Sequence, residues 1–299
     1  MSSFIGIDLG TQSVKVVLYD EAGHLLSLAQ RDYPLLTPQI GFAEQDPEEW
    51  WKQTFSALQE VLYSVSNREI KAISFSGQMH GLVMLDNNYK SVCPAIIWAD
   101  QRSEKEVHFI REKLRSRLAP IAGSDIATGF MGASLCWVKN NRPDLYNKTR
   151  WVMLPKDYIK IKLGLPPSSD VADAASTLLF DINQRNWSEE IIKELDLKSS
   201  LFPPIYESAQ IIGQVSPSVQ KELGITGDAF VIAGAGDQHC AALGNGIINE
   251  GEVLITIGTG GQVFTAIQKP IVDSLLRIHT FCHAVPQTWH LLGASLCAG

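Results

Sequence analysis

The sequence predicts a mixed α/β fold, and two observations support this prediction. Near the N-terminus, an apolar run at 4–7 leads into the turn 8–13, and a second apolar run follows. The same order of strand, glycine-hydroxyl turn and strand returns near the other end, at 253–257 and 258–261. Between these units the apolar residues recur mainly at helical spacing, which is typical of amphipathic helices. The chain therefore combines strands at both ends with a largely helical middle.

Composition and charge narrow the classes of partner. The 299 residues are 45% hydrophobic and 19% charged, with a net charge of −7 and no long basic block. Nucleic acid or an anionic membrane is therefore not expected as the main partner. The five cysteines are odd in number and scattered, which indicates neither a disulfide framework nor a zinc site. Without a signal-peptide core or a long apolar run, we expect a cytoplasmic protein that holds any anionic ligand in a local site.

The expected elements follow from local patterns. Asp46-Pro47 predicts a helix start, because aspartate caps a first turn and proline fits inside it. Asn87-Asn88 separates two apolar runs and predicts a hairpin. In chain order, we expect strands at 4–9, 13–20, 24–32, 70–76, 82–86, 92–98, 230–233 and within 251–294, and helices that begin at 46 and cover 101–118, 133–140, 155–163, 188–195 and 238–246.

Both glycine-hydroxyl turns have the composition of a phosphate site. Glycine lets the backbone approach a ligand closely, and exposed amides and hydroxyls then form a concavity that suits phosphate. Two such turns, separated by most of the chain, suggest two lobes that close on one polyphosphate. The residues are Gly10, Thr11, Gln12 and Ser13 in the first turn, and Gly258, Thr259 and Gly260 in the second.

A set of motifs resembles one enzyme family. The motifs are Ile5-Gly6-Ile7-Asp8-Leu9-Gly10-Thr11, Gly77-Gln78-Met79-His80-Gly81, Trp98 with Asp100 and Arg102, Leu154-Pro155-Lys156-Asp157-Tyr158, Ser169-Asp170-Val171-Ala172-Asp173-Ala174 and Ala233-Gly234-Ala235-Gly236-Asp237. In order and spacing they resemble the FGGY carbohydrate kinases, most nearly the xylulokinase branch. The resemblance implies an actin-like, ribonuclease-H-type ATPase fold, with a first lobe over 1–245 and the beginning of a second over 246–299. It also implies ATP and Mg²⁺ as cofactors and D-xylulose as the sugar, and leaves a homodimer open.

Two aspartates at strand ends are the candidate catalytic groups. The resemblance assigns Asp8 to the metal and phosphate region, where a carboxylate is the expected holder of Mg²⁺. It assigns Asp237 the role of the base that takes the proton from the sugar hydroxyl, which attacks the γ-phosphoryl group. By residue type alone, Asp8 is also compatible with an ordinary turn and Asp237 with a helix N-cap. Lys15, on the next strand, is expected either to reach the phosphates or to be solvated.

The loop Gln78, Met79 and His80 is the expected sugar site. It combines polar groups for hydroxyls with an apolar wall, although a lone loop histidine is also compatible with a structural role. The resemblance makes this loop the basis for naming xylulose. Gln238, expected to contact the sugar, stands where the family pattern has asparagine, which leaves another sugar open.

Trp98 and Asp100 are expected to border the sugar pocket. Trp98 offers a face for a sugar ring, while Asp100 has the alternative of pairing with Arg102. Asp157 and Asp173 also match family motifs, and we interpret them as scaffold of the first lobe.

Xylulokinases are considerably longer than this chain. The sequence ends inside an apolar run, at 295–299, and no adenosine pocket is found in it. We therefore expect a carbohydrate kinase whose 299-residue form binds sugar, binds ATP weakly and turns over poorly. The alternative is a catalytically impaired sugar-binding half, and residues 251–299 are expected to expose apolar surface.

Overall fold

The N-terminal strands form one side of a mixed sheet in the computed structural model, which describes residues 2–64, 69–257 and 261–295. β1 (Ser2–Leu9) pairs antiparallel with β2 (Ser13–Asp20), and β2 pairs antiparallel with β3 (Leu25–Asp32). On the other side of β1 lies β5 (Glu69–Gly77), which is parallel to it. These strands confirm the sequence prediction. The sheet continues beyond β5 with β14 (Phe230–Ile232) and β15 (Ala235–Gly236), both parallel to β5, and with the edge strand β13 (Ile211–Gln214).

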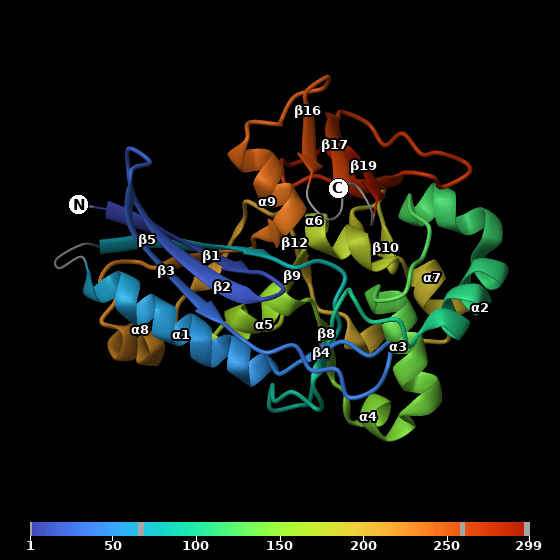
Figure 1. The fold of residues 1–299 in the computed structure, drawn as a ribbon, viewed down its shortest axis with the longest axis horizontal. Coiled ribbons are helices and arrows are strands. Elements are labelled where there is room, and N and C mark those ends of the chain that lie inside the picture. The colour runs from blue at the N-terminus through green and yellow to red at the C-terminus, as the bar shows by residue number, and fades with distance from the viewer. Residues whose placement is uncertain (1, 65–68, 258–260, 296–299) are drawn as a thin grey trace.

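Three helices cover the sheet, and the first, α1 (Pro47–Tyr63), contacts both α5 (Pro155–Lys162) and α8 (Pro217–Leu223) (Figure 1). The predicted start of α1 is confirmed, because the Asp46 carboxylate accepts the N–H of Glu48 at 2.9 Å. Trp50 and Leu58 of α1 are fully buried in the core beneath the sheet. Burial of a side chain of this size stabilises the fold by about 1.5–3 kcal/mol, so α1 fixes the strands from which the site projects.

The middle of the chain is helical, with two departures from the prediction. It contains α2 (Glu104–Leu114), α3 (Met131–Asn141), α4 (Pro143–Lys148) and α7 (Glu189–Glu194). The helix expected over 101–118 ends at Leu114, because Arg115 has φ 27° and 3₁₀ and π turns follow. A further helix, α4, was not expected; it begins at Pro143, since proline is tolerated in a first turn.

The prediction of a hairpin over 82–98 is wrong, because its two arms do not pair with each other as strands. β6 (Val83–Leu85) pairs with the distant β8 (Trp151–Met153), and β7 (Ala95–Ile96) pairs with β4 (Glu44–Gln45). Isolated bridges alone join the two predicted arms. The turn between them does form, because Asp86 accepts two backbone N–H groups there. Further short pairs are β9 (Ser169–Asp170) with β12 (Ile205–Tyr206), and β10 (Phe180–Asp181) with β11 (Asn186–Trp187).

A second, antiparallel sheet packs on α6 (Val171–Ala174) and α9 (Asp237–Gly244). Its order is β16 (Val253–Ile257), β17 (Gly261–Ile267), β19 (Trp289–Ser295) and β18 (His279–Cys282). Figure 1 shows this sheet above α6 and α9, and Phe264 and Phe281 share one core with Val171 and Ala242. The predicted strand-turn-strand setting is confirmed by the pairing of β16 with β17, whereas the turn Gly258-Thr259-Gly260 lies outside the described residues.

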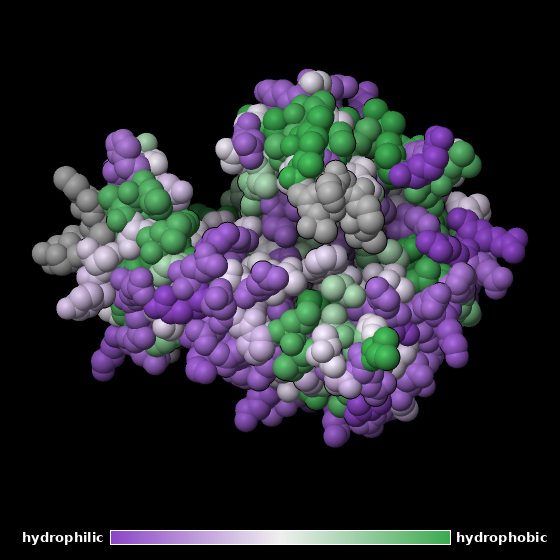
Figure 2. Space-filling model, in the orientation of Figure 1, coloured by the Kyte–Doolittle hydropathy of each residue, from purple (hydrophilic) through white to green (hydrophobic). Residues whose placement is uncertain are grey.

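The outer face of the second sheet is apolar. Apolar side chains gather over β16 and β17 at the top of Figure 2, where Ile255 and Ile257 are 61% and 75% exposed. In the part of the chain that the structure describes, no helix is long and apolar enough to span a membrane.

Candidate functional site

The ends of three strands bring the two predicted aspartates to one edge of the sheet. In the ladder, Ser76 of β5 lies opposite Asp8 of β1 on one side and opposite Ala235 of β15 on the other. Asp237 follows β15 directly as the first residue of α9. Two strand spacings separate β1 from β15, so the two backbones lie roughly 10 Å apart. A substrate held at this edge therefore has one carboxylate on each side.

The first phosphate turn is held by its carbonyl groups. Gly10 accepts hydrogen bonds from the Tyr33 hydroxyl and, at 3.3 Å, from the Gln78 side chain. Thr11 accepts one from the Gln45 side chain at 2.6 Å, and Gln45 in turn accepts one from Gln78 at 2.8 Å. Because these partners use the carbonyl oxygens, the amide side of the turn remains available.

A hollow lies beside the phosphate turn. The N–H groups of Thr11 and Gln12 donate to no acceptor within the described residues. Trp98 donates its indole N–H to the Thr11 hydroxyl at 2.9 Å, while Ser13 accepts from a neighbouring glutamine. A cavity of about 400 Å³ lies against Thr11, Gln12 and Tyr33. Free amides beside a cavity are the arrangement that binds phosphate.

Asp8 and Lys15 lie on the same face of the sheet, since they are directly opposite in the β1–β2 ladder. One oxygen of Asp8 accepts the Ser76 hydroxyl at 2.8 Å, and its other oxygen has no hydrogen-bond partner among the described residues. Lys15 is exposed and makes no ion pair among the described residues. No group of three or more metal-ligating side chains occurs among the described residues. The arrangement fits Mg²⁺ held by one carboxylate together with phosphate oxygens and water.

The glycines before Asp237 allow the backbone to pass close to Phe75 and Met79. A side chain at Gly234, where φ is +81°, would come within 2.5 Å of the Phe75 carbonyl oxygen, and one at Gly236 within 2.6 Å of Met79. The N-cap of α9 is Gly236, so Asp237 does not occupy the cap position considered for it. Burial, together with the charge of Asp8, raises the pKa of Asp237 to about 6, although the N–H of Gln238 works against this. A carboxylate with this pKa is suited to take a proton near neutral pH.

The predicted sugar loop divides into a bracing and a receiving part. Gln78 is buried, and its amide nitrogen holds the phosphate turn, while its side-chain oxygen has no hydrogen-bond partner among the described residues. Met79 is buried against Gly236, directly before Asp237. His80 is the partly exposed residue of the loop, at a φ of +70°. Of the three residues, His80 is therefore the one placed to meet a ligand.

Two further groups near His80 were missed by the sequence reasoning. The Ser176 carbonyl oxygen lies 2.7 Å from His80 Nδ1. The ring of Phe130 stacks on the imidazole, with centroids 4.0 Å apart and planes at 8°. Burial lowers the pKa of His80 to about 4, so the ring is neutral at pH 7. Nothing in the sequence near Phe130 or Ser176 signals a contact across 50 to 100 residues.

Asp100 follows the pairing interpretation rather than the sugar interpretation. It is fully buried and accepts hydrogen bonds from Arg102 Nε at 2.9 Å, from Arg102 Nη2 at 2.7 Å and from the N–H of Ala43 at 2.7 Å. Arg102 also reaches Glu44 at 2.7 Å and stacks on Phe42. Both oxygens of Asp100 are thus occupied, and its role is to fold the loop that carries Trp98. Trp98 itself lies at the phosphate turn and is 43% exposed.

A buried lysine–aspartate cluster lies beneath the loop. Lys156 approaches Asp157, Asp170 and Asp173 at 2.9, 2.6 and 2.9 Å, and Lys160 approaches Asp157 at 2.7 Å. All five side chains are fully buried, which agrees with the scaffold role expected for Asp157 and Asp173. The Cβ of Lys156 lies 3.0 Å from where a side chain at Gly77 would begin, so the cluster supports the sugar loop from below.

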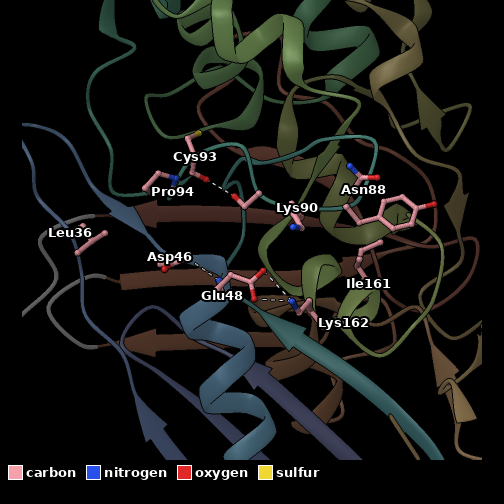
Figure 3. A pocket seen from close by; sticks show the side chains of 11 residues that line it. Leu36, Asp46, Glu48, Asn88, Lys90, Cys93, Pro94, Ile161 and Lys162 are labelled. Carbon is pink, nitrogen blue, oxygen red and sulfur yellow. Dashed lines mark hydrogen bonds and ion pairs between the residues drawn. The ribbon is translucent and has the colours of Figure 1, made fainter. Parts of the chain in front are cut away.

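Cavity size alone does not locate this site. A cavity of about 820 Å³ lies between the start of α1, residues 88–94 and the end of α5. Figure 3 shows its lining, in which Glu48 and Lys162 form an ion pair at 2.8 Å. No residue predicted for catalysis, sugar or phosphate lines it. Gln238, predicted to contact the sugar, is partly exposed in the first turn of α9, next to the fully buried His239.

The chain is similar in sequence and fold to known proteins. Residues 3–244 match the N-terminal domain of the FGGY family of carbohydrate kinases. The chain is 38% identical over 301 residues to a xylulose kinase of Lactococcus lactis, covering 100% of this chain and 60% of that protein. It is 31% identical over 299 residues to a gluconokinase of Bacillus subtilis, covering 100% of this chain and 58% of that protein. A crystal structure described as a xyloylose kinase from Brucella ovis superposes with a TM-score of 0.94 at 33% identity, covering 99% of this chain and 61% of that chain. The chain thus spans about 60% of the length of the curated relatives it matches.

Proposed function

The chain belongs to the FGGY family of carbohydrate kinases, which have an actin-like ATPase fold, and we propose that it acts in the ATP-dependent phosphorylation of D-xylulose at its 5-hydroxyl. The observation that carries this proposal is the meeting of Asp8, the free amides of the first turn and Asp237 at one edge of the sheet. Phosphate-binding groups and a base candidate flank the same strand, β5.

Asp237 is the proposed base. As the sugar oxygen forms its bond to the γ-phosphorus, the bond between that phosphorus and the oxygen of ADP breaks, and the hydroxyl proton passes to the Asp237 carboxylate. The pKa of about 6 keeps most of the carboxylate ionised at pH 7, and a positioned base aligned on the nucleophile is what this reaction demands.

The turn and Asp8 are proposed to bind the phosphates. The N–H groups of Thr11 and Gln12, the Ser13 hydroxyl and the Lys15 ammonium supply donors and positive charge at this edge. Asp8 is proposed to hold Mg²⁺, which would neutralise charge on the transferring phosphoryl group. Gly258, Thr259 and Gly260 remain the proposed second phosphate turn.

Recognition of the sugar is assigned to the loop at His80. His80 presents a neutral ring, Met79 forms an apolar wall beside Gly236, and Gln238 follows the base. Trp98 borders the phosphate side, while Asp100 is not proposed as a sugar contact because both its oxygens are occupied.

A sugar acid is the second candidate substrate. The gluconokinase relative, at 31% identity, supports gluconate as an alternative substrate. A sugar-binding role without turnover is the alternative from another class.

A substrate panel tests the proposal. The purified chain is assayed with ATP, Mg²⁺ and D-xylulose, L-xylulose, D-ribulose, gluconate or glycerol, with ADP release coupled to a reporter, and binding of each sugar is measured by calorimetry. We expect D-xylulose to give the highest kcat/KM, and Asp237→Asn to abolish the sugar-dependent rate without abolishing sugar binding. A higher kcat/KM with gluconate would contradict the choice of sugar. Sugar binding without any sugar-dependent ADP release would support the role without turnover.

A further inference from the structure

His80 is held in a strained conformation by its own loop. The N–H of Gly81 bonds to the carbonyl of Met79 at 2.9 Å, which closes a γ-turn with His80 at its centre. The φ of +70° at His80 is uncommon for a residue other than glycine. Such strain costs of order 1–3 kcal/mol and persists only where the surroundings impose it. The backbone conformation of His80 is therefore imposed by the fold.

The Ser176 carbonyl decides which ring nitrogen carries the proton. A carbonyl oxygen only accepts, so the Nδ1 atom of His80, 2.7 Å away, must be the donor. In a neutral ring, Nε2 is then left as an acceptor. Stacking on Phe130 removes water from one face, and the titratable neighbour His279, on β18, opposes a positive charge at the ring. Burial under Phe130 and the nearby His279 favour the neutral ring, whereas the Ser176 carbonyl raises the pKa of His80 and serves to select the nitrogen that carries the proton.

Both holding groups are themselves fixed. A side chain at Gly129, where φ is +80°, would lie 2.0 Å from the Trp98 carbonyl oxygen, so glycine alone allows this loop to close and place Phe130. Ser176 lies in the turn after α6, where its hydroxyl donates to the Asp173 carbonyl at 2.7 Å. Phe130 is 7% exposed and Ser176 is fully buried.

We propose that Phe130 and the Ser176 carbonyl are positioning groups that present His80 Nε2 as a hydrogen-bond acceptor, so that the site selects a sugar whose hydroxyl donates at this point. The selection step rests on the proposed function, whereas the state of the ring is a property of the chain alone. A hydroxyl can donate to Nε2, but a fluorine or hydrogen in its place cannot.

The ring state is tested without sugar. Long-range ¹H–¹⁵N correlation spectra of the labelled chain, with His80→Gln to assign the ring, report the protonation of each nitrogen. We expect a protonated Nδ1 and a bare Nε2 from pH 8 down to about 5. Phe130→Leu should introduce the other tautomer or a titration nearer pH 6, and Phe130→Tyr should restore the original spectrum. Phe55→Leu is the matched control, because it removes a distant aromatic pair on α1. A proton on Nε2, or a ring unchanged in Phe130→Leu, overturns the proposal.

The selection step is tested by calorimetry with sugar analogues. Phe130→Leu should weaken D-xylulose binding by about 3- to 10-fold, the range of an aromatic stacking contribution, while Phe130→Tyr and Phe55→Leu leave it near wild type. At one sugar position, the deoxy and deoxyfluoro analogues should lose affinity equally. Fluoro analogues that bind better than deoxy analogues at every position would show that the ring donates instead, which overturns the selection step. If the ring state is as expected but calorimetry detects no binding of any sugar, the proposed function is contradicted and the assignment of the ring still holds.

Discussion

Asp237 and the trio Asp157, Asp170 and Asp173 lie on elements around β5, yet the fold treats their charges differently. The trio is fully buried against Lys156 and Lys160, at distances of 2.6–2.9 Å. Asp237 has no cationic partner among the described residues, accepts one local N–H, and has its pKa raised to about 6. The trio holds a loop in place, whereas Asp237 remains able to accept a proton.

This difference distinguishes aspartates that stabilise the fold from an aspartate that takes part in the reaction. All four residues lie in motifs of the same family resemblance. What distinguishes them is access: the trio is fully buried against lysines, so no substrate reaches it, whereas Asp237 is partly exposed and has no lysine partner among the described residues. Substitutions should therefore affect stability in the cluster and turnover at Asp237.

The largest effect is expected at Asp237. Asp237→Asn should lower kcat by about 10²–10⁴, the usual contribution of a general base, in a form of the protein that turns over. The melting temperature should not fall, because the variant removes a carboxylate that burial disfavours. Steady-state kinetics and thermal unfolding measure the two effects. Near-normal kcat would remove Asp237 from the mechanism.

The cluster should show the opposite pattern. Lys156→Met leaves buried carboxylates without their shared cation and should cost about 3–5 kcal/mol in the free energy of unfolding. Lys162→Met, which breaks the more exposed pair with Glu48, is the control and should cost about 0–1 kcal/mol. Urea denaturation compares them.

A third variant, Asp173→Asn, tests the cluster even if Lys156→Met does not fold. The pKa of Asp173 is raised to about 7 by burial and by the neighbouring carboxylates, despite Lys156. Asp173→Asn should therefore cost less than Lys156→Met. Equal costs for Lys156→Met and Lys162→Met would mean that the cluster does not carry stability.

A smaller effect is expected at His80. His80→Ala should weaken D-xylulose binding by about 1–3 kcal/mol, the cost of an unsatisfied polar group, with little change in ATP affinity. His24→Ala, at an exposed position, is the control. Titration calorimetry that gives the same sugar affinity for both variants would exclude the loop as the sugar site.

Sequence patterns predicted the frame of this site well, because its residues sit at the ends of regular strands. Asp8 and Asp237 each follow an apolar run, and parallel strands bring such ends together. The hairpin over 82–98 failed because β8, far along the chain, competes for β6. Asp100 was ambiguous for a related reason, since its partner Ala43 is distant in sequence. Contacts such as those of Phe130 and Ser176 with His80 carry no local signal, so the sequence could not reveal them.

The pH dependence of kcat/KM for D-xylulose tests the central claim most directly. Asp237 must be ionised to accept the proton, and burial with the Asp8 charge raises its pKa to about 6. The rate should therefore be level above about pH 7 and fall about tenfold per pH unit well below pH 6. An acid limb near pH 4, or no acid limb at all, would contradict the assignment of Asp237 as the base.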